Sequence, residues 1–152
     1  MKNQDKYTID IIRKTLKEKD NITVIDDKYI DVKTKILCQN ANGYYIYIVW
    51  SNYLTRHGIG RCVDKSNDYS IYNINHFLKT NKIPFECIST EYISANDNLF
   101  FRCSRCGEIV STAWRNINKN DNKSRHKIIC KNCDGRTESL HALVLKQMFM
   151  YY

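Results

Sequence analysis

Residues 100–152 read FFRCSRCGEIVSTAWRNINKNDNKSRHKIICKNCDGRTESLHALVLKQMFMYY, and this stretch decides the fold. It holds two C-x-x-C pairs with 23 residues between them. Pairs at this spacing are typical of a tetrahedral four-cysteine zinc site, because each pair can wrap a tight turn around the metal. Gly107 follows the first pair and relieves crowding where the backbone turns sharply. The predicted ligands of one structural zinc ion are Cys103, Cys106, Cys130 and Cys133.

Other cysteine chemistries fit this pattern less well. Two disulfides need an oxidising compartment, and the N-terminal residues MKNQDKYTID lack the apolar core of a signal peptide. A redox-active C-x-x-C normally stands alone beside a βαβ pattern, whereas this motif is doubled. An iron–sulfur cluster or a rubredoxin-like iron site uses the same ligands, so the spacing leaves iron open as the metal.

The residues around the two pairs predict a treble-clef or zinc-ribbon layout. A hairpin should follow the first pair, with Val110 on a strand and Trp114 just after it, where we interpret the indole as small-core packing rather than as a base-stacking group. A helix should follow the second pair, because apolar residues recur at helical spacing in residues 139–149. We therefore expect an α+β fold in which a zinc module, residues 85–152, follows an N-terminal α+β module, residues 1–84.

The N-terminal module shows three local patterns. Residues 8–19 and 70–81 each place apolar side chains on one helical face. Residues 34–50 predict a β-hairpin with a two-residue turn at Asn42-Gly43, and its tyrosines could fill a small core or stack on nucleic-acid bases. Residues 51–62 contain Gly58 and Gly60 and are expected to form a loop.

The two halves of the chain can be aligned as an internal repeat. At an offset of 64 residues, Gly43 falls on Gly107 and Trp50 falls on Trp114. Residues 36–80 would then be a degenerate treble clef that has lost its metal and replaced it with a hydrophobic core. The alternative is coincidence in a biased composition.

Three cysteines stand outside the two pairs. Cys38 and Cys62 are single in the first half, where the second half has pairs, and the aligned repeat would make them remnants of those pairs. A second metal site built from Cys38, Cys62 and Cys87 with His57 or His76 has no support from spacing.

The net charge of +8 is unevenly distributed. Residues 102–136 carry nine Lys or Arg against three acids, which is the electrostatic pattern of a phosphate-binding surface. Part of this excess could instead offset the charge of four metal-bound thiolates. The predicted nucleic-acid contacts are Arg102, Arg105, Arg115, Lys119, Lys123, Arg125, Lys127 and Lys131.

Other function classes are disfavoured by the sequence. No apolar run is long enough to span a membrane, so we expect a cytoplasmic protein with no membrane partner. The carboxylates are scattered and form no pair that would mark a catalytic acid and base. The sequence also shows no nucleophilic residue together with a base that could activate it. We therefore expect no enzymatic activity.

Six short segments between residues 65 and 150 carry a resemblance to a known family: KSNDYSI (65–71), NIN (73–75), PF (84–85), LFFRCSRC (99–106), WRNI (114–117) and CKNC (130–133). They resemble the zinc-ribbon or treble-clef modules of phage and mobile-element proteins. Those modules lie N-terminal to very-short-patch-repair-like or homing-type endonuclease domains of the PD-(D/E)XK class. The family has Pro where this chain has Asp68.

The resemblance implies a DNA-recognition module, located in the cytoplasm of a bacterial host. The family's catalytic carboxylates have no counterpart here, so we expect DNA binding without cleavage. The alternative is a small phage-type inhibitor, anti-CRISPR or anti-restriction, that binds a host nuclease or a CRISPR effector complex. Residues 139–151 are unusually apolar and could also support a homodimer.

Overall fold

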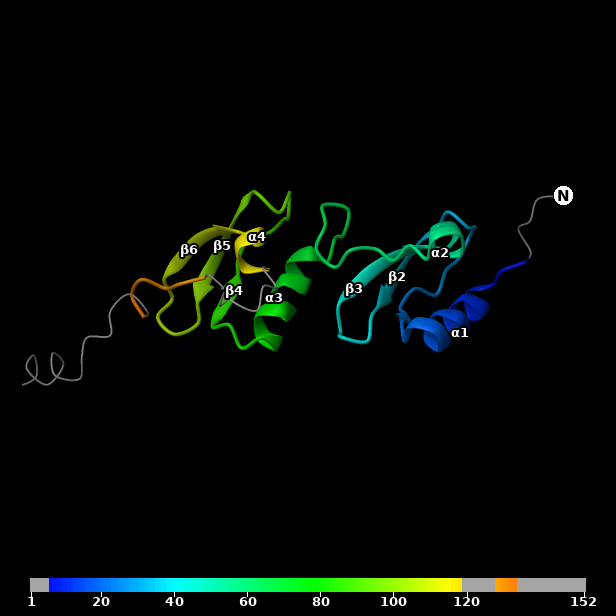
Figure 1. Ribbon diagram of the computed structural model, residues 1–152, viewed down its shortest axis with the longest axis horizontal. Coiled ribbons are helices and arrows are strands. Elements are labelled where there is room, and N and C mark those ends of the chain that lie inside the picture. Colours follow the sequence, from blue (N-terminus) through cyan, green and yellow to red (C-terminus); the bar gives the residue numbers. More distant parts are fainter. Residues whose placement is uncertain (1–5, 119–127, 134–152) are drawn as a thin grey trace, which may run out of the picture. The chain divides into compact units, whose positions relative to one another are not determined.

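The order of helices and strands along the chain repeats (Figure 1). The structure is a computed structural model that describes residues 6–118 and 128–133. A helix, three strands and a second helix occur in residues 9–56, the first repeat, and the same order returns in residues 70–117, the second repeat. The first repeat comprises α1 (Ile9–Asp20), β1 (Thr23–Val24), β2 (Lys35–Gln39), β3 (Tyr45–Val49) and α2 (Trp50–Arg56). The second comprises α3 (Ser70–Thr80), β4 (Phe85–Cys87), β5 (Asn98–Cys103), β6 (Ile109–Ala113) and α4 (Trp114–Ile117).

Each repeat builds its own antiparallel sheet. The strand orders are β1-β2-β3 and β4-β5-β6, so that neighbours in sequence are neighbours in the sheet. The fold is therefore mixed α and β, with two small three-stranded sheets. None of the described helices has the length and apolarity needed to cross a membrane.

The chain divides into two compact units. Unit 1 takes in the described residues up to Lys82 together with Thr90–Ser94. Unit 2 takes in Ile83–Ser89 and the described residues from Ala95 onward. The helix α3 therefore belongs to unit 1, although the order of elements along the chain makes it the first element of the second repeat.

The two hairpins have the same strand register. β2 pairs with β3 from Lys35↔Val49 to Gln39↔Tyr45, and β5 pairs with β6 from Asn98↔Ala113 to Arg102↔Ile109. Adding 63 to the residue numbers of β2 and 64 to those of β3 converts the first set of pairs into the second. The single-residue difference arises because the connecting loop of the second hairpin is one residue longer. This match extends the sequence alignment of Trp50 with Trp114 to whole strands.

Buried side chains repeat as well. Ile12 and Leu16 of α1 are fully buried, and so are Ile74 and Leu78, which stand 62 residues later on α3. Each hairpin ends in a tryptophan that begins a helix and is at most 5 % exposed. Apolar residues four apart on a helix lie on one face, so each repeat buries the same stripe of its first helix.

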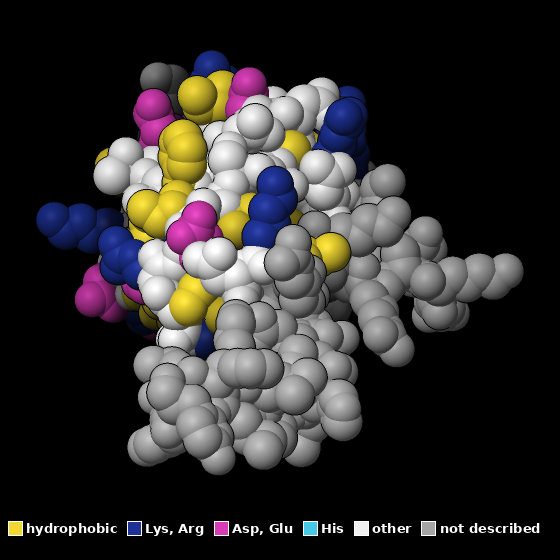
Figure 2. All heavy atoms as spheres, turned by 90° about the vertical axis from the view of Figure 1, so that its left-hand side faces the viewer, with side chains coloured by type: hydrophobic (Ala, Val, Ile, Leu, Met, Phe, Trp, Pro, Cys, Tyr) yellow, Lys and Arg dark blue, Asp and Glu magenta, His cyan; other side chains and the backbone are white. Residues whose placement is uncertain are grey.

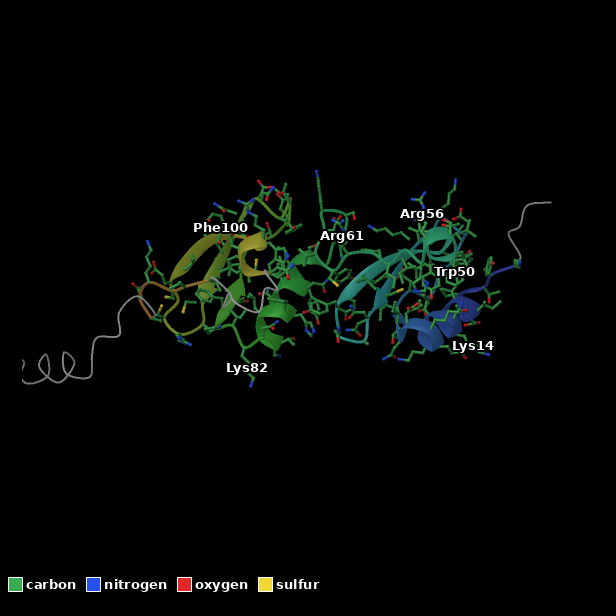
Figure 3. All side chains as sticks on the ribbon, in the orientation of Figure 1. Lys14, Trp50, Arg56, Arg61, Lys82 and Phe100 are labelled. Carbon is green, nitrogen blue, oxygen red and sulfur yellow. The ribbon has the colours of Figure 1, made fainter. Side chains whose placement is uncertain are left out.

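The core of unit 1 lies between its sheet and two helices. Alternate residues of β2 and β3 point to one face, where Ile36 and Cys38 meet Ile46 and Ile48. This face packs against α1 and against α2, whose Trp50 stacks on Tyr53 at a centroid distance of 5.2 Å. Figure 3 shows Trp50 among the side chains of this core. The tyrosines of β3 occupy the opposite face and are only partly buried.

The predicted hairpin over residues 34–50 is confirmed, but its turn differs from the prediction. The Gly43 amide donates to the Asn40 carbonyl, and the Asn40 amide donates to the Tyr44 carbonyl, each at 3.0 Å. Gly43 has a φ of +88°. This is a three-residue loop that ends in a left-handed glycine, not a two-residue turn at Asn42-Gly43.

The prediction of a loop over residues 51–62 is wrong for its first half. Residues up to Arg56 form α2, because Trp50 and Tyr53 stand three apart and both face the core. The helix ends at His57, which has a left-handed φ of +52°. The two glycines that suggested a loop lie beyond this end.

Two buried asparagines tie the first hairpin to the chain that follows it. The Asn73 amide donates to the carbonyls of Tyr45 (2.7 Å) and Cys62 (2.6 Å), and its side-chain oxygen accepts from the Tyr45 amide (2.9 Å). The Asn67 amide donates to the carbonyls of Tyr45, Arg61 and Cys62. Both asparagines are at most 5 % exposed. Polar cross-links therefore hold this junction, in addition to the hydrophobic core that the sequence predicted.

The hairpin register also corrects the assumed counterparts of the metal-site cysteines. Cys103 donates its amide to the Glu108 carbonyl, as Asn40 does to Tyr44, so Asn40 occupies the position of Cys103. Cys38 lies two residues earlier, buried in the core, where burial and then Asp26 raise the pKa of its thiol to about 12. Cys38 is therefore a core thiol, and the hairpin register aligns it with Phe101 rather than with a cysteine of the first pair.

We predict that Asn73→Ala destabilises unit 1 by roughly 3 kcal/mol, because it leaves buried backbone groups without partners. The measurement is urea unfolding followed by Trp50 fluorescence in a Trp114→Phe background, since each unit contains one tryptophan. Asn52→Ala is the matched control, because Asn52 is exposed on α2, and it should change stability by less than about 0.5 kcal/mol. Equal effects of the two substitutions would contradict the role given to Asn73.

Candidate metal centre

The four cysteines predicted as ligands come together in unit 2. Cys103 is the last residue of β5, and Cys106 lies in the loop that leads to β6. Cys130 and Cys133 lie in the described segment 128–133. The four sulfur atoms are all within 4.8 Å of one another. Two loops far apart in sequence therefore present one group of thiols.

The spacing of the sulfur atoms fits a tetrahedral metal. Sγ of Cys103 is 3.8 Å from Sγ of Cys133, and Sγ of Cys106 is 3.4 Å from Sγ of Cys130. Metal–sulfur bonds of about 2.3 Å in a regular tetrahedron separate the sulfurs by about 3.8 Å. A disulfide would require about 2.05 Å. The arrangement is thus compatible with one structural metal site and is not a pair of disulfides.

Backbone hydrogen bonds shape both cysteine turns. In the first, the Gly107 amide donates to the Cys103 carbonyl at 2.9 Å, and Gly107 adopts a φ of +79°. In the second, the Cys133 amide donates to the Cys130 carbonyl at 3.2 Å. A non-glycine residue at position 107 would be strained by the left-handed backbone, although a β-carbon there would meet no neighbour within 4 Å.

A side-chain contact joins the two turns. The Asn132 amide donates to a carboxylate oxygen of Glu108 at 3.1 Å. Asn132 stands between the two cysteines of the second pair, and Glu108 directly follows Gly107. The two turns are therefore held to each other by a polar contact beside the thiols.

The thiols influence one another's ionisation. Burial raises the pKa of the Cys103 thiol, but hydrogen bonds from the backbone amides of Cys106 and Arg105 and from neighbouring thiols outweigh burial and lower it to about 7. Hydrogen bonding with the Cys106 thiol, followed by burial, raises the pKa of Cys133 to about 12. Cys103 therefore loses its proton most readily and Cys133 loses it with difficulty, because each further thiolate adds a negative charge next to those already formed. A divalent cation removes this conflict.

The donor set determines what a metal here can do. Four thiolates fill the coordination sphere and leave no position for water or substrate. Such a site contributes to folding and does not perform metal catalysis. The chemistry of the donors suits zinc or iron.

The other three cysteines do not join this group. Cys38 and Cys87 are at most 4 % exposed in the apolar cores of their units, and Cys62 is partly buried. Across residues 6–118 and 128–133, Cys103, Cys106, Cys130 and Cys133 form the one group of three or more metal-ligating side chains.

The structure describes four of the eight residues predicted to contact nucleic acid. Arg102, Arg105, Arg115 and Lys131 are all exposed. Arg102 lies opposite Glu86 in the sheet, and Arg115 donates to the Asn96 side chain at 3.0 Å. The remaining predicted contacts lie outside the described residues: Lys119, Lys123, Arg125 and Lys127. The helix predicted over residues 139–149 and the apolar segment 139–151 also lie outside them.

The described residues hold only part of the charge that the sequence count covers. In the described part of the chain, unit 2 has four Lys or Arg against three acids, whereas unit 1 has thirteen against nine. In the end-on view of Figure 2, basic, acidic and hydrophobic side chains are interspersed. The positive excess of the described residues thus lies mainly in unit 1. The excess predicted for residues 102–136 includes residues 119–127, which lie outside the described residues, so it stays a prediction.

Comparisons with protein-family models, with curated proteins and with solved structures found no match to this chain. What the candidate site can do therefore follows from its own geometry.

We predict that metal removal unfolds unit 2 and leaves unit 1 folded, because structural metal sites supply folding free energy. In a Trp50→Phe background, a chelator should shift Trp114 emission to that of an exposed indole. In a Trp114→Phe background, Trp50 emission should stay unchanged. The Trp50→Phe substitution removes no hydrogen bond, because the Trp50 indole N–H has no partner in the described structure. Loss of the Trp50 signal on chelation would contradict the independence of unit 1.

We also predict that Cys130→Ser abolishes metal binding and that Cys62→Ser retains one metal ion per chain. Cys130 belongs to the thiol group, whereas Cys62 lies outside it. Metal analysis of both purified variants checks this expectation. Retention of metal by Cys130→Ser would rule out the four-thiolate set.

Proposed function

We propose that this chain is a non-catalytic, zinc-dependent nucleic-acid-binding protein that binds double-stranded DNA. Zinc is the proposed metal, and a treble clef is the proposed description of unit 2. Four cysteine ligands and a hairpin that carries the first pair support both proposals.

The observation that carries the proposal is the excess of exposed cations over carboxylates. The described residues carry seventeen Lys or Arg against twelve Asp or Glu. The whole chain carries a formal charge of +8. Cations of this kind attract the phosphate backbone and fix the position of a protein on it without specifying sequence.

Unit 2 is proposed to present its exposed cations to the backbone. Arg102 projects from the outer face of β5, and Lys131 lies beside the second cysteine pair. The same outer face exposes Phe100 and Ile109, each 53 % exposed, which would add apolar contact with sugars or bases. The metal would hold this surface together rather than touch the ligand.

The test is fluorescence anisotropy with a duplex of about 20 base pairs from about 50 to 200 mM salt, the range over which phosphate contacts are most visible. We predict that replacing Arg102, Arg105, Arg115 and Lys131 with Gln weakens binding to every sequence. The slope of log affinity against log salt should fall by up to about 0.9 for each phosphate that is no longer neutralised.

A control variant removes the same charge from α1 and α2, where no nucleic-acid contact is assigned: Lys14, Lys17, Lys19 and Arg56, each changed to Gln. An unchanged salt slope in the unit 2 variant would refute the assignment of this face. Failure of the zinc-loaded protein to bind any duplex or single strand would refute nucleic-acid binding and leave the inhibitor hypothesis.

A further inference from the structure

Unit 1 contains a surface hollow that the proposed function does not use. It has a volume of about 250 Å³ and lies against the outer face of β3. The loop after α2 closes one side of it. This loop can approach the strand because Gly60 has no side chain, since a β-carbon there would lie 2.2 Å from the Tyr47 carbonyl oxygen. The Gly60 amide donates to that same carbonyl at 3.1 Å.

The lining of the hollow favours an anion. Its charged members are Lys35 and Arg61, and no carboxylate lines it among the described residues. Neutral polar groups come from Asn52, Ser66 and Asn67. Two cations within one concave site attract an anion more strongly than the same cations on a flat surface, because the protein walls exclude water.

The two cations are held differently. The Lys35 ammonium lies 4.0 Å from the centre of the Tyr47 ring and donates to the Ser66 carbonyl at 2.6 Å. An ammonium has three donors, so Lys35 keeps donors for a ligand. The Arg61 carbonyl is held by the Asn67 amide at 2.9 Å, while its guanidinium bonds to no described residue.

The nearest acids are occupied by other partners. Asp68 accepts from the Tyr47 hydroxyl at 3.2 Å, and burial, followed by this hydrogen bond, raises the pKa of Tyr47 to about 12. The ring under Lys35 therefore stays a neutral phenol. Asp64 accepts from the amide and the hydroxyl of Ser66, and these hydrogen bonds, followed by the charges of Arg61 and Lys35, lower its pKa, so Asp64 offsets part of the positive charge near the hollow. Both carboxylates thus stabilise the loop around the hollow.

The second repeat lacks the corresponding groups. The hairpin register places Asn98 at the position of Lys35 and Ser111 at the position of Tyr47. Neither the cation nor the ring beneath it is kept. The hollow is therefore a property of the first repeat and not a by-product of the shared fold.

The size of the hollow limits the ligand. Sites that enclose drug-sized molecules measure about 300–1,000 Å³, so this hollow suits a single phosphate better than a whole nucleotide. Arginine offers paired donors in a planar fork that matches two phosphate oxygens, and lysine adds a point charge. These are the groups by which proteins hold a phosphodiester.

We propose that this hollow binds one phosphate of a nucleic-acid backbone through Arg61 and Lys35, which places a specific contact on unit 1. The inference rests on the proposed function. The lining of the hollow would bind a free phosphate ion by the same chemistry, and the proposed nucleic-acid binding is what selects a backbone phosphate. It adds a defined site to a unit that would otherwise contribute only diffuse charge.

The experiment compares Arg61→Gln with Arg56→Gln in the full, zinc-loaded chain. Both arginines are exposed in unit 1 and both substitutions remove one charge, but Arg56 lies outside the hollow, on α2. Affinity for a duplex of about 20 base pairs is measured against salt. Arg61→Gln should weaken binding several-fold and lower the salt slope by about 0.9, the value expected for one phosphate contact. Arg56→Gln should have the smaller effect, and Lys35→Gln should resemble Arg61→Gln.

A second measurement identifies the source of the phosphate. Amide spectra of the full chain are titrated with pyrophosphate and, separately, with the duplex. The duplex should shift the amides of Gly58, Gly60 and Ser66, and these shifts should disappear in Arg61→Gln.

Each outcome is decisive. Equal effects of Arg61→Gln and Arg56→Gln would overturn the hollow as a phosphate site and leave the proposed function standing. Failure of the wild-type chain to bind any nucleic acid would overturn both. Shifts at the same amides with pyrophosphate but not with the duplex would assign the hollow to a free phosphate compound and overturn the backbone contact.

Discussion

Four thiols of unit 2 lie within 4.8 Å of one another. At this spacing, repulsion between thiolates opposes ionisation of all four unless a cation lies between them. Cys103 ends a strand and Cys130 belongs to a segment 27 residues further along the chain. Both are at most 2 % exposed, so the site forms part of the small core rather than an appendage. A metal bound by these four sulfurs would hold the hairpin to the later segment. Without one, the same sulfurs repel as soon as a second thiolate forms.

Unit 1 has a hairpin of the same register but no group of four thiols beside it among the described residues, so other interactions must stabilise it. Metal coordination supplies about 10–16 kcal/mol in small zinc domains, whereas one hydrogen bond contributes about 1 kcal/mol net. The cross-links of Asn67 and Asn73 cannot replace a metal by themselves. The difference is made up by apolar burial, because α1 and α2 bring Ile12, Leu16 and Trp50 onto the sheet. The two repeats therefore share an order of elements, and the two hairpins differ in what can stabilise them.

The sequence predicts those features that depend on local spacing. The C-x-x-C pairs, the hairpin with its glycine and the aligned tryptophans are visible because each needs particular residues a few positions apart. The asparagine cross-links were not predictable, since a buried Asn has no distinctive pattern and its partners are backbone groups up to 28 residues away. The helix α2 was missed because the glycines after it outweighed the two aromatic residues inside it. The hollow proposed to bind phosphate brings Lys35 and Arg61 together across 26 positions, and only the fold does so.

The charge distribution suggests how the two units divide the work. A divalent metal with four thiolates carries a net charge of −2, which more than cancels the single excess cation of the described part of unit 2. Under the proposed function, the hollow of unit 1 and the basic residues 119–127 would add to the long-range attraction of a phosphate backbone. Unit 2 offers something else in its described residues, an outer sheet face where Phe100 and Ile109 flank Arg102. Apolar side chains such as these stabilise direct contact with a ligand, whereas they do not attract it from a distance.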